Sequence, residues 1–231
     1  MSDLSISALI QTLTVMALPV IFAITLHEAA HGFVAYRLGD DTAFRMGRVT
    51  FNPLKHIDLV GTIVFPLLLL FGSGGRFIFG YAKPVPVRFD RLNHPRRDMV
   101  YVALAGPITN IILAVISAAL LGGVMLLPPY FRNWTETNLI NSVEFNVIIA
   151  VFNMLPLPPL DGGRVAVGLL PDFLAIPLAR TERYGMLILL TLLFFLPMIG
   201  GYLHMDLNVI WWIIEWPAKW LLQIIGWVTG Q

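Results

Sequence analysis

The sequence predicts an all-α integral membrane protein, a polytopic helix bundle with a small β or extended element near its polar site. Of its 231 residues, 57% are hydrophobic and 13% are charged, whereas a soluble domain has about 45–50% apolar and about 25% charged residues. The gaps between the charged residues are long enough to cross a hydrocarbon core of about 30 Å as helices. Strand-forming residues at 43–51 and the prolines Pro84 and Pro86 predict the extended element.

The whole chain, residues 1–231, is predicted to be a single transmembrane domain, because no repeat or polar extra domain interrupts the apolar pattern. A helical span needs about 20 predominantly apolar residues. Four stretches meet this requirement, although Glu144 interrupts the third: 5–36, 99–127, 138–156 and 184–203. The N-terminus lacks the basic region of a signal peptide, so we expect the first span to remain in the mature protein.

Two further apolar stretches are shorter or more mixed in character. Residues 207–228 form an amphipathic pattern rich in tryptophan, which fits either a fifth span or a helix that lies in the membrane interface. Residues 59–71 are too few to span and contain Pro66, so we expect this segment to be re-entrant or buried. The sequence therefore predicts between four and six spans.

The basic residues predict how the bundle is oriented. Of the 15 lysines and arginines, thirteen lie on one face of the predicted bundle if the segment 59–71 enters and leaves on the same side. Such residues mark the cytoplasmic side of a membrane protein. The net charge of +1 gives no reason to expect a nucleic-acid partner. The absence of cysteine excludes disulfide scaffolds, thiolate zinc sites and cysteine nucleophiles.

A metal-ligand pattern stands at the inner end of the first predicted span, where residues 27–31 read His-Glu-Ala-Ala-His. Residues four apart share one face of a helix, so His27 and His31 can both point an imidazole at one ion. Glu28, between them, is placed to take a proton from water instead of binding the metal. At this composition the pattern arises by chance in roughly 0.6% of sequences. Two histidines that merely bond to neighbouring helices would leave Glu28 unexplained.

A hydrolytic zinc site usually has three protein ligands and an open position. No histidine follows His31 closely, so the third ligand comes from further away, and His56, His94 and Asp161 are the candidates. The three prolines just before Asp161 cannot continue a helix. Non-helical backbone at membrane depth is tolerated only where it is buried in protein or lines a water-filled cavity. Because this run closes a span directed inward, the geometry favours Asp161, although a simple turn aspartate is the alternative.

These residues resemble the site-2 protease family of intramembrane zinc metalloproteases, in its compact bacterial and archaeal branch, which lacks PDZ and nucleotide-sensing domains. The resemblance covers most of residues 26–163. It is carried by the histidine pair and by four further segments: 51–58 (FNPLKHID), 80–87 (GYAKPVPV), 105–110 (AGPITN) and 153–162 (NMLPLPPLDG).

The resemblance implies that His27, His31 and Asp161 bind zinc, about one ion per chain, and that Glu28 is the catalytic base. It also implies that Asn153 holds the substrate or the oxyanion near the metal, and that Asn110 faces the site from the neighbouring helix, where it would contact the substrate as well. Hydrogen bonding between helices is the alternative role for both asparagines.

We therefore expect an intramembrane zinc metalloendopeptidase in a prokaryotic cell membrane, with its site toward the cytoplasm. Its partners would be a transmembrane protein or peptide substrate and the surrounding lipid, and its oligomeric state is left open. A substrate helix must unwind before cleavage, and an edge strand at 43–51 would bind the unwound chain. A metal transporter or sensor that uses the same cluster, and a pseudoprotease that only binds helical clients, are the alternatives.

Overall fold

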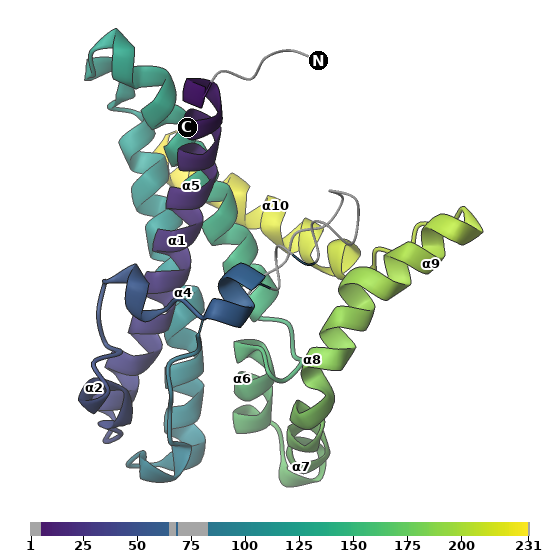
Figure 1. The fold of residues 1–231 in the computed structure, drawn as a ribbon. Helices are drawn as coiled ribbons and strands as arrows, with labels where there is room; N and C mark the ends of the chain where they lie inside the picture. The colour runs from purple at the N-terminus through teal and green to yellow at the C-terminus, as the bar shows by residue number, and fades with distance from the viewer. Residues whose placement is uncertain (1–5, 65–67, 69–82, 231) are drawn as a thin grey trace.

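Helix α1 (Ile6–Arg37) runs the length of the bundle and carries the histidine pair in its C-terminal third. The computed structural model describes residues 6–64, 68 and 83–230. In it α1 lies beside α4 (Pro95–Leu121) and α5 (Pro129–Asn153), and these helices form the centre of the molecule (Figure 1). Helices α1 and α4 are apolar along most of their length, as spans that face lipid are, whereas α5 carries many polar residues in its first half.

Small residues allow the central helices to approach one another closely. Ala23 of α1, Ala114 of α4 and Ala150 of α5 are 0%, 0% and 2% exposed. In lipid such residues favour helix association because they let the backbones pack together. Helix α10 (Val209–Thr229) covers α4 and α5 through Ala218 and its neighbours.

The chain between α5 and the next helix is irregular, as its prolines require. Helix α6 begins at Asp161, directly after the loop, and ends at Leu169. Gly162 and Gly163 have no room for a side chain, since a Cβ atom there would collide with backbone atoms of residues 154–158. Helix α6 therefore packs directly on the proline loop, which fixes the position of its first residue.

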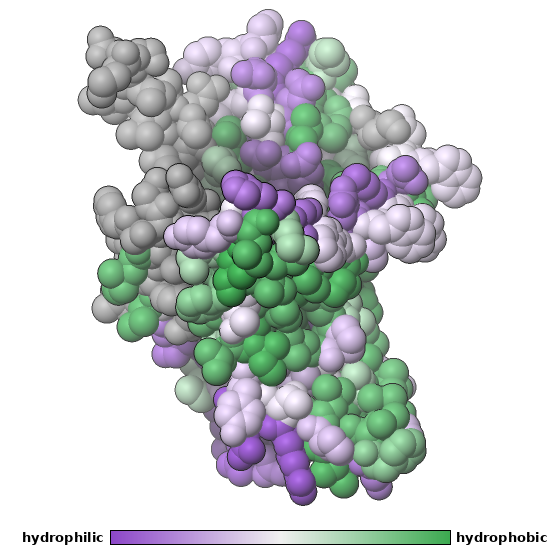
Figure 2. Space-filling view, turned by 90° about the vertical axis from the view of Figure 1, so that its right-hand side faces the viewer, coloured by the Kyte–Doolittle hydropathy of each residue, from purple (hydrophilic) through white to green (hydrophobic). Residues whose placement is uncertain are grey.

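Helix α8 and its continuation project away from the bundle. The helices α8 (Glu182–Leu190), η5 (Thr191–Phe195, a π-helix) and α9 (Leu196–Leu203) follow one another without a break (Figure 1). Figure 2, which faces this side of the molecule, shows a broad hydrophobic zone with hydrophilic residues above and below it. This distribution is the one expected of a surface that crosses a bilayer.

The described part of the chain also contains several short helices. They are α2 (Thr42–Arg45), η1 (Pro53–Lys55), η2 (Leu59–Val64, a π-helix), η3 (Phe89–Arg91), η4 (Val124–Leu126) and α7 (Asp172–Arg180). Of the segment expected to be re-entrant or buried, 59–71, the structure describes 59–64 and 68. Its role stays a prediction.

The all-helical fold class is confirmed. In the described residues, the segments Thr14–Arg37, Pro95–Leu121 and Glu182–Leu203 are long and apolar enough to cross a membrane. They contain 39%, 44% and 11% buried residues in their most apolar windows, so the last is nearly unpartnered by protein. Helices α5 and α10 fall outside these criteria of length and hydropathy, and both pack against the central bundle.

The strand expected at 43–51 is wrong. Residues 42–45 form α2, and a turn follows, in which the Arg48 amide donates to the Ala43 carbonyl at 2.9 Å. The Asp40 carboxylate accepts from the Thr42 amide at 3.0 Å, which favours a helical turn over an extended chain. The extended element instead lies at 83–88, which has no regular secondary structure, and none of the residues that the structure describes forms a β-strand.

Candidate metal centre

Two side chains of α1 and one of α6, which is distant in the sequence, converge on one point of the bundle. His27 and His31 come from successive turns of α1, and Asp161 is the first residue of α6. The Nε2 atoms of the two histidines lie 3.0 Å apart, and Oδ2 of Asp161 lies 3.1 Å from that of His27 and 3.3 Å from that of His31. The residues are 5%, 7% and 5% exposed, respectively, so the cluster is buried.

The spacing of these three atoms fits a zinc ion. Ligand atoms at about 2.0–2.1 Å from a tetrahedral zinc lie about 3.3 Å from one another. Within the described residues, His27, His31 and Asp161 form a group of metal-ligating side chains close enough to share an ion. Their donor set of two imidazoles and one carboxylate is one that zinc enzymes use.

The hydrogen bonds on the far side of each ring show which nitrogen is free to bind a cation. Nδ1 of His31 lies 2.7 Å from the Val102 carbonyl oxygen, which can only accept, so this Nδ1 carries the proton. Nδ1 of His27 lies 2.5 Å from Oδ1 of Asn110 and is protonated for the same reason. Both Nε2 atoms then present lone pairs to each other and to Asp161, whose buried Oδ2 has no hydrogen-bond partner. Three acceptors this close require a shared cation, or a proton on one ring.

A chain of amides fixes the orientation of Asn110. Its Nδ2 donates to the Ala23 carbonyl at 3.2 Å and to Oδ1 of Asn146 at 2.8 Å. Asn146 in turn donates to the Ser142 carbonyl at 2.8 Å. Because backbone carbonyls only accept, each amide has one possible orientation, and Oδ1 of Asn110 must face His27. Asn110 and Asn146 are 0% and 1% exposed, so the donors of Asn110 are directed into the protein.

Helix α4 makes room for the two imidazoles at Gly106. A Cβ atom at this position would lie 2.5 Å from Nε2 of both His27 and His31. Real Cβ atoms do not approach other heavy atoms this closely. Gly106 therefore allows α4 to pack against the cluster without displacing the rings.

Glu28 points at the extended segment 83–88. Its Oε2 accepts a hydrogen bond from the Val85 amide at 2.7 Å. Val85 stands between Pro84 and Pro86, neither of which has an amide hydrogen, so it supplies the only N–H of this triplet. One oxygen of the Glu28 carboxylate is thus held, and the other is left for a second donor.

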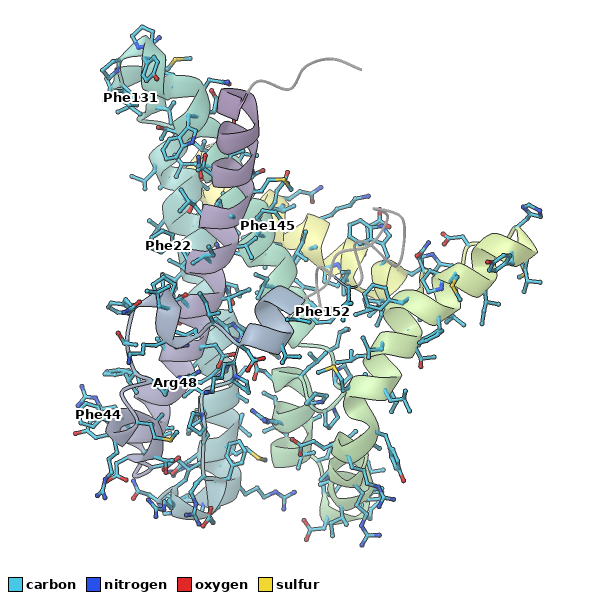
Figure 3. All side chains as sticks on the ribbon, viewed as in Figure 1. Phe22, Phe44, Arg48, Phe131, Phe145 and Phe152 are labelled. Carbon is cyan, nitrogen blue, oxygen red and sulfur yellow. The ribbon has the colours of Figure 1, made fainter. Side chains whose placement is uncertain are left out.

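Side chains and backbone from three other places hold the same extended segment. The Lys83 amide donates to the His56 carbonyl at 2.9 Å, and Arg48, labelled in Figure 3, donates to the Lys83 carbonyl at 2.6 Å. The Arg88 amide donates to Oδ2 of Asp40 at 2.6 Å. The segment is anchored at both ends and presents its middle to Glu28.

A cavity of about 310 Å³ opens onto the cluster. One wall comes from the extended segment and the other from α6 and the proline loop. Its lining residues are His27, Glu28, His31, Pro84, Val85, Val87, Val102, Asn153, Pro159, Asp161, Arg164 and Met186. The cavity has room for a short stretch of extended peptide, and the side chains of His27, His31 and Asp161 border it from α1 and α6.

The other candidates for a third ligand lie elsewhere. His56 donates from Nε2 to the Thr50 carbonyl at 3.0 Å and is 2% exposed. His94 precedes α4, where its amide bonds the Asp98 carboxylate at 2.8 Å. Neither lines the cavity, whereas Asn153 does, with its Nδ2 donating to the Ile149 carbonyl at 3.0 Å.

Sequence reasoning assigned no role to Gly106, Val85, Asn146 or Arg164. A glycine beside a polar site in a helix is a signal of close approach, and Gly106 stands in a segment that carried the family resemblance. Arg164 follows Asp161 by three residues, the spacing of a shared helix face. The roles of Val85 and Asn146 depend on contacts between distant segments, which leave no local signal.

Comparisons with known proteins show which proteins this chain resembles. The family model described as peptidase family M50 matches residues 15–145. The chain is 38% identical over 199 residues to "Putative zinc metalloprotease YwhC" of Bacillus subtilis, which covers 81% of this chain and 82% of that protein. It is 30% identical over 174 residues to "Putative zinc metalloprotease Rip2" of Mycolicibacterium smegmatis, covering 75% of this chain and 64% of that protein. No solved structure matches the chain significantly.

Proposed function

The chain belongs to peptidase family M50, the site-2 protease family, and from this premise we propose that it cleaves peptide bonds of membrane-embedded substrate helices. Membership makes it a membrane zinc metalloprotease. The observation that carries the finer proposal is the convergence of His27, His31 and Asp161 beside Glu28, in a buried cavity. A soluble protease would not need to build this cluster between apolar helices.

His27, His31 and Asp161 would hold the metal, about one zinc ion per chain. When bound, zinc activates water near neutral pH and polarises the scissile carbonyl as a Lewis acid. Asn110 and the Val102 carbonyl orient the two imidazoles through their Nδ1 atoms. Such outer partners fix the tautomer and increase the affinity of a histidine for metal.

Glu28 acts as the general base. It lies one residue from His27, and the Val85 amide holds one of its oxygens at 2.7 Å. The other oxygen is free to accept the proton of the attacking water and to pass it to the leaving amine. Because only one of the two oxygens is held by the backbone, the carboxylate can be oriented by one oxygen and transfer a proton with the other.

Asn153 lines the cavity from the end of α5 and is the residue that we propose to contact the substrate or the developing oxyanion. One hydrogen of its amide bonds the Ile149 carbonyl, which leaves the second as a donor. For Asn110 we propose a different role from the substrate contact suggested by the resemblance. Both of its amide hydrogens are taken within the protein, so it acts by orienting His27.

We propose that the substrate lies in the cavity as an extended chain along residues 83–88. A transmembrane helix bonds its own carbonyls, so it must unwind before a protease can reach one. The extended wall of Pro84, Val85 and Val87 fits a strand better than a helix. The partner is therefore a transmembrane protein or peptide that is delivered from the surrounding lipid.

The site faces the cytoplasm in this proposal. Arg37 ends α1 six residues after His31, and Arg96 and Arg97 stand in the first turn of α4 at the same end of the bundle (Figure 1). Basic residues at the end of a span favour the cytoplasmic side. The catalytic residues would then lie within the inner half of the membrane, about two turns from the basic border.

The transporter or sensor alternative has no support. A pathway for metal across a membrane needs a series of sites. In the part of the chain that the structure describes, the group formed by His27, His31 and Asp161 stands without a second such group.

Reconstitution in lipid vesicles tests the proposed function. The zinc-loaded chain should cut a transmembrane reporter peptide, and Glu28→Gln should reduce the rate by about 100-fold or more because it removes the base. Equal zinc content in the two proteins controls for loss of the site. Cleavage by Glu28→Gln at the wild-type rate would contradict the assignment of Glu28.

A further inference from the structure

Arg164 lines the cavity and has no role in the chemistry described above. It stands three residues after Asp161, so the two side chains leave the same face of α6. Among the described residues that line the cavity it is the one lysine or arginine. Its side chain is 35% exposed, so the guanidinium is partly open to the cavity.

Among the described residues, Arg164 finds few hydrogen-bond partners. Its Nε atom is buried and has no hydrogen-bond partner. Its Nη2 lies 3.7 Å from Oε1 of Glu182, which is an ion pair but too long for a hydrogen bond. The Cζ atom of the guanidinium lies 5.3 Å from the centre of the Phe89 ring, a cation–π contact that satisfies none of its donors.

We propose that Arg164 is a substrate-positioning residue, whose guanidinium donates hydrogen bonds to a backbone carbonyl of the unwound substrate. This inference rests on the proposed function, because it needs an unwound peptide in the cavity. Unwinding a helix leaves its carbonyls without their donors, and an unpaired carbonyl in an apolar site is unfavourable. A guanidinium can donate hydrogen bonds to such a carbonyl and so replace the bond that the carbonyl made in the helix.

The arrangement of the cavity walls explains why the Arg164 guanidinium lies on the α6 side of the cavity. An extended chain directs its carbonyls alternately to its two sides. On one side it would meet the backbone of residues 84–87. On the other it would meet α6, where Arg164 stands beside Asp161. Arg164 thus supplies a donor on the wall that has no extended backbone.

Kinetics of three variants in reconstituted vesicles test this inference. Arg164→Ala should raise KM by ~10-fold with little change in kcat, because a carbonyl that is bound equally in ground state and transition state affects binding alone. Arg164→Lys keeps the charge and a donor, and it should restore part of the loss. Glu182→Gln is the matched control, since it removes the ion pair and leaves the guanidinium, and it should keep the wild-type KM.

A binding measurement separates this role from effects on turnover. In a Glu28→Gln background the chain should bind the reporter peptide without cutting it, and adding Arg164→Ala should weaken that binding by ~10-fold. Zinc content should be the same with and without the Arg164 change. Equal losses in Arg164→Ala and Glu182→Gln would show a structural ion pair and overturn the inference.

Two further outcomes distinguish the sources of failure. If the wild type cuts the reporter and Arg164→Ala does so with unchanged KM and affinity, the inference fails and the proposed function stands. If the zinc-loaded wild type cuts no membrane reporter, the proposed function fails and the inference fails with it. A defect that appears only in vesicles with anionic lipid would assign Arg164 to a lipid phosphate instead of a substrate carbonyl, and would overturn the inference.

Discussion

A Cβ atom on Gly106 would lie 2.5 Å from Nε2 of His31, so these two residues of neighbouring helices are packed as closely as atoms allow. The contact links the packing of α4 on α1 to the geometry of the metal cluster. It means that a single methyl group on α4 must displace a ligand atom, or separate the two helices.

Gly106→Ala is therefore expected to lose most of its zinc while the helical content is retained. The overlap with both imidazoles leaves no rotamer that preserves the spacing of the ligands. Metal content of the purified chain and its circular dichroism spectrum measure the two effects. Gly201→Ala is the control, because a Cβ atom at Gly201 meets no atom within 4 Å. Full zinc occupancy in Gly106→Ala would contradict this packing.

Asn110→Ala should weaken zinc binding by about 10-fold to 100-fold, as the loss of an outer partner of a metal-binding histidine usually does. The substitution leaves Nδ1 of His27 without its acceptor, and the ring is then free to turn. A competition titration with a zinc chelator measures the affinity. Asn138→Ala is the control, because Asn138 is only partly buried and its amide donates to the carbonyl of Trp134 in its own helix. Equal affinities in both variants would exclude this role.

The sequence could predict the helical pair of ligands because the period of an α-helix places His27 and His31 on one face. It could also indicate Asp161, since the proline run ends a span on the same side of the membrane. The outer partners could not be predicted in this way. Which atom of Asn110 meets His27 depends on Asn146, a residue of a third helix.

The strand expected at 43–51 shows where local preference fails. Phe44 and Val49 favour strands, but a strand needs a partner with free backbone groups. In the structure the Asp40 carboxylate accepts from the Thr42 amide at the start of a helical turn, and Phe44, labelled in Figure 3, stacks on Tyr36 with ring centres 4.6 Å apart. These tertiary contacts outweigh the intrinsic preference of residues 43–51 for a strand. The prolines of 83–88, in contrast, indicate a chain without helix, as the structure has it.

Val85→Pro should reduce kcat by ~10-fold with unchanged zinc content, because it removes the amide hydrogen that holds Glu28. An extended segment between prolines tolerates another proline better than a helix would. Val85→Ala keeps the amide and is the matched control. Stopped assays on a reporter peptide give both rates. If the alanine variant falls as far as the proline variant, the side chain and not the amide is what matters.

Stability toward acid should depend on Asp40, which lies outside the membrane spans. Its carboxylate is buried, which opposes ionisation, but hydrogen bonds from Thr42 and from the Arg88 amide outweigh this and lower its pKa below the usual 3.8. A lowered folded-state pKa stabilises the fold above the unfolded value, and this stabilisation is lost as pH falls through the folded value.

Asp40→Asn should therefore lower the Tm at neutral pH, and the difference from wild type should shrink as the pH falls below about 4. Thermal unfolding of the two proteins in detergent, followed over this range, measures the difference. A difference in Tm that stays constant down to the lowest pH would show that the Asp40 charge contributes nothing.

The metal content of single-ligand variants tests the central claim most directly. We expect about one zinc ion per chain in the wild type and in Glu28→Gln, because Glu28 is not a ligand. We expect a large loss in His27→Ala, His31→Ala and Asp161→Ala, each of which removes one of three converging atoms. Zinc retained at the wild-type level and affinity in Asp161→Ala would contradict the account, since the proline loop would then deliver no ligand.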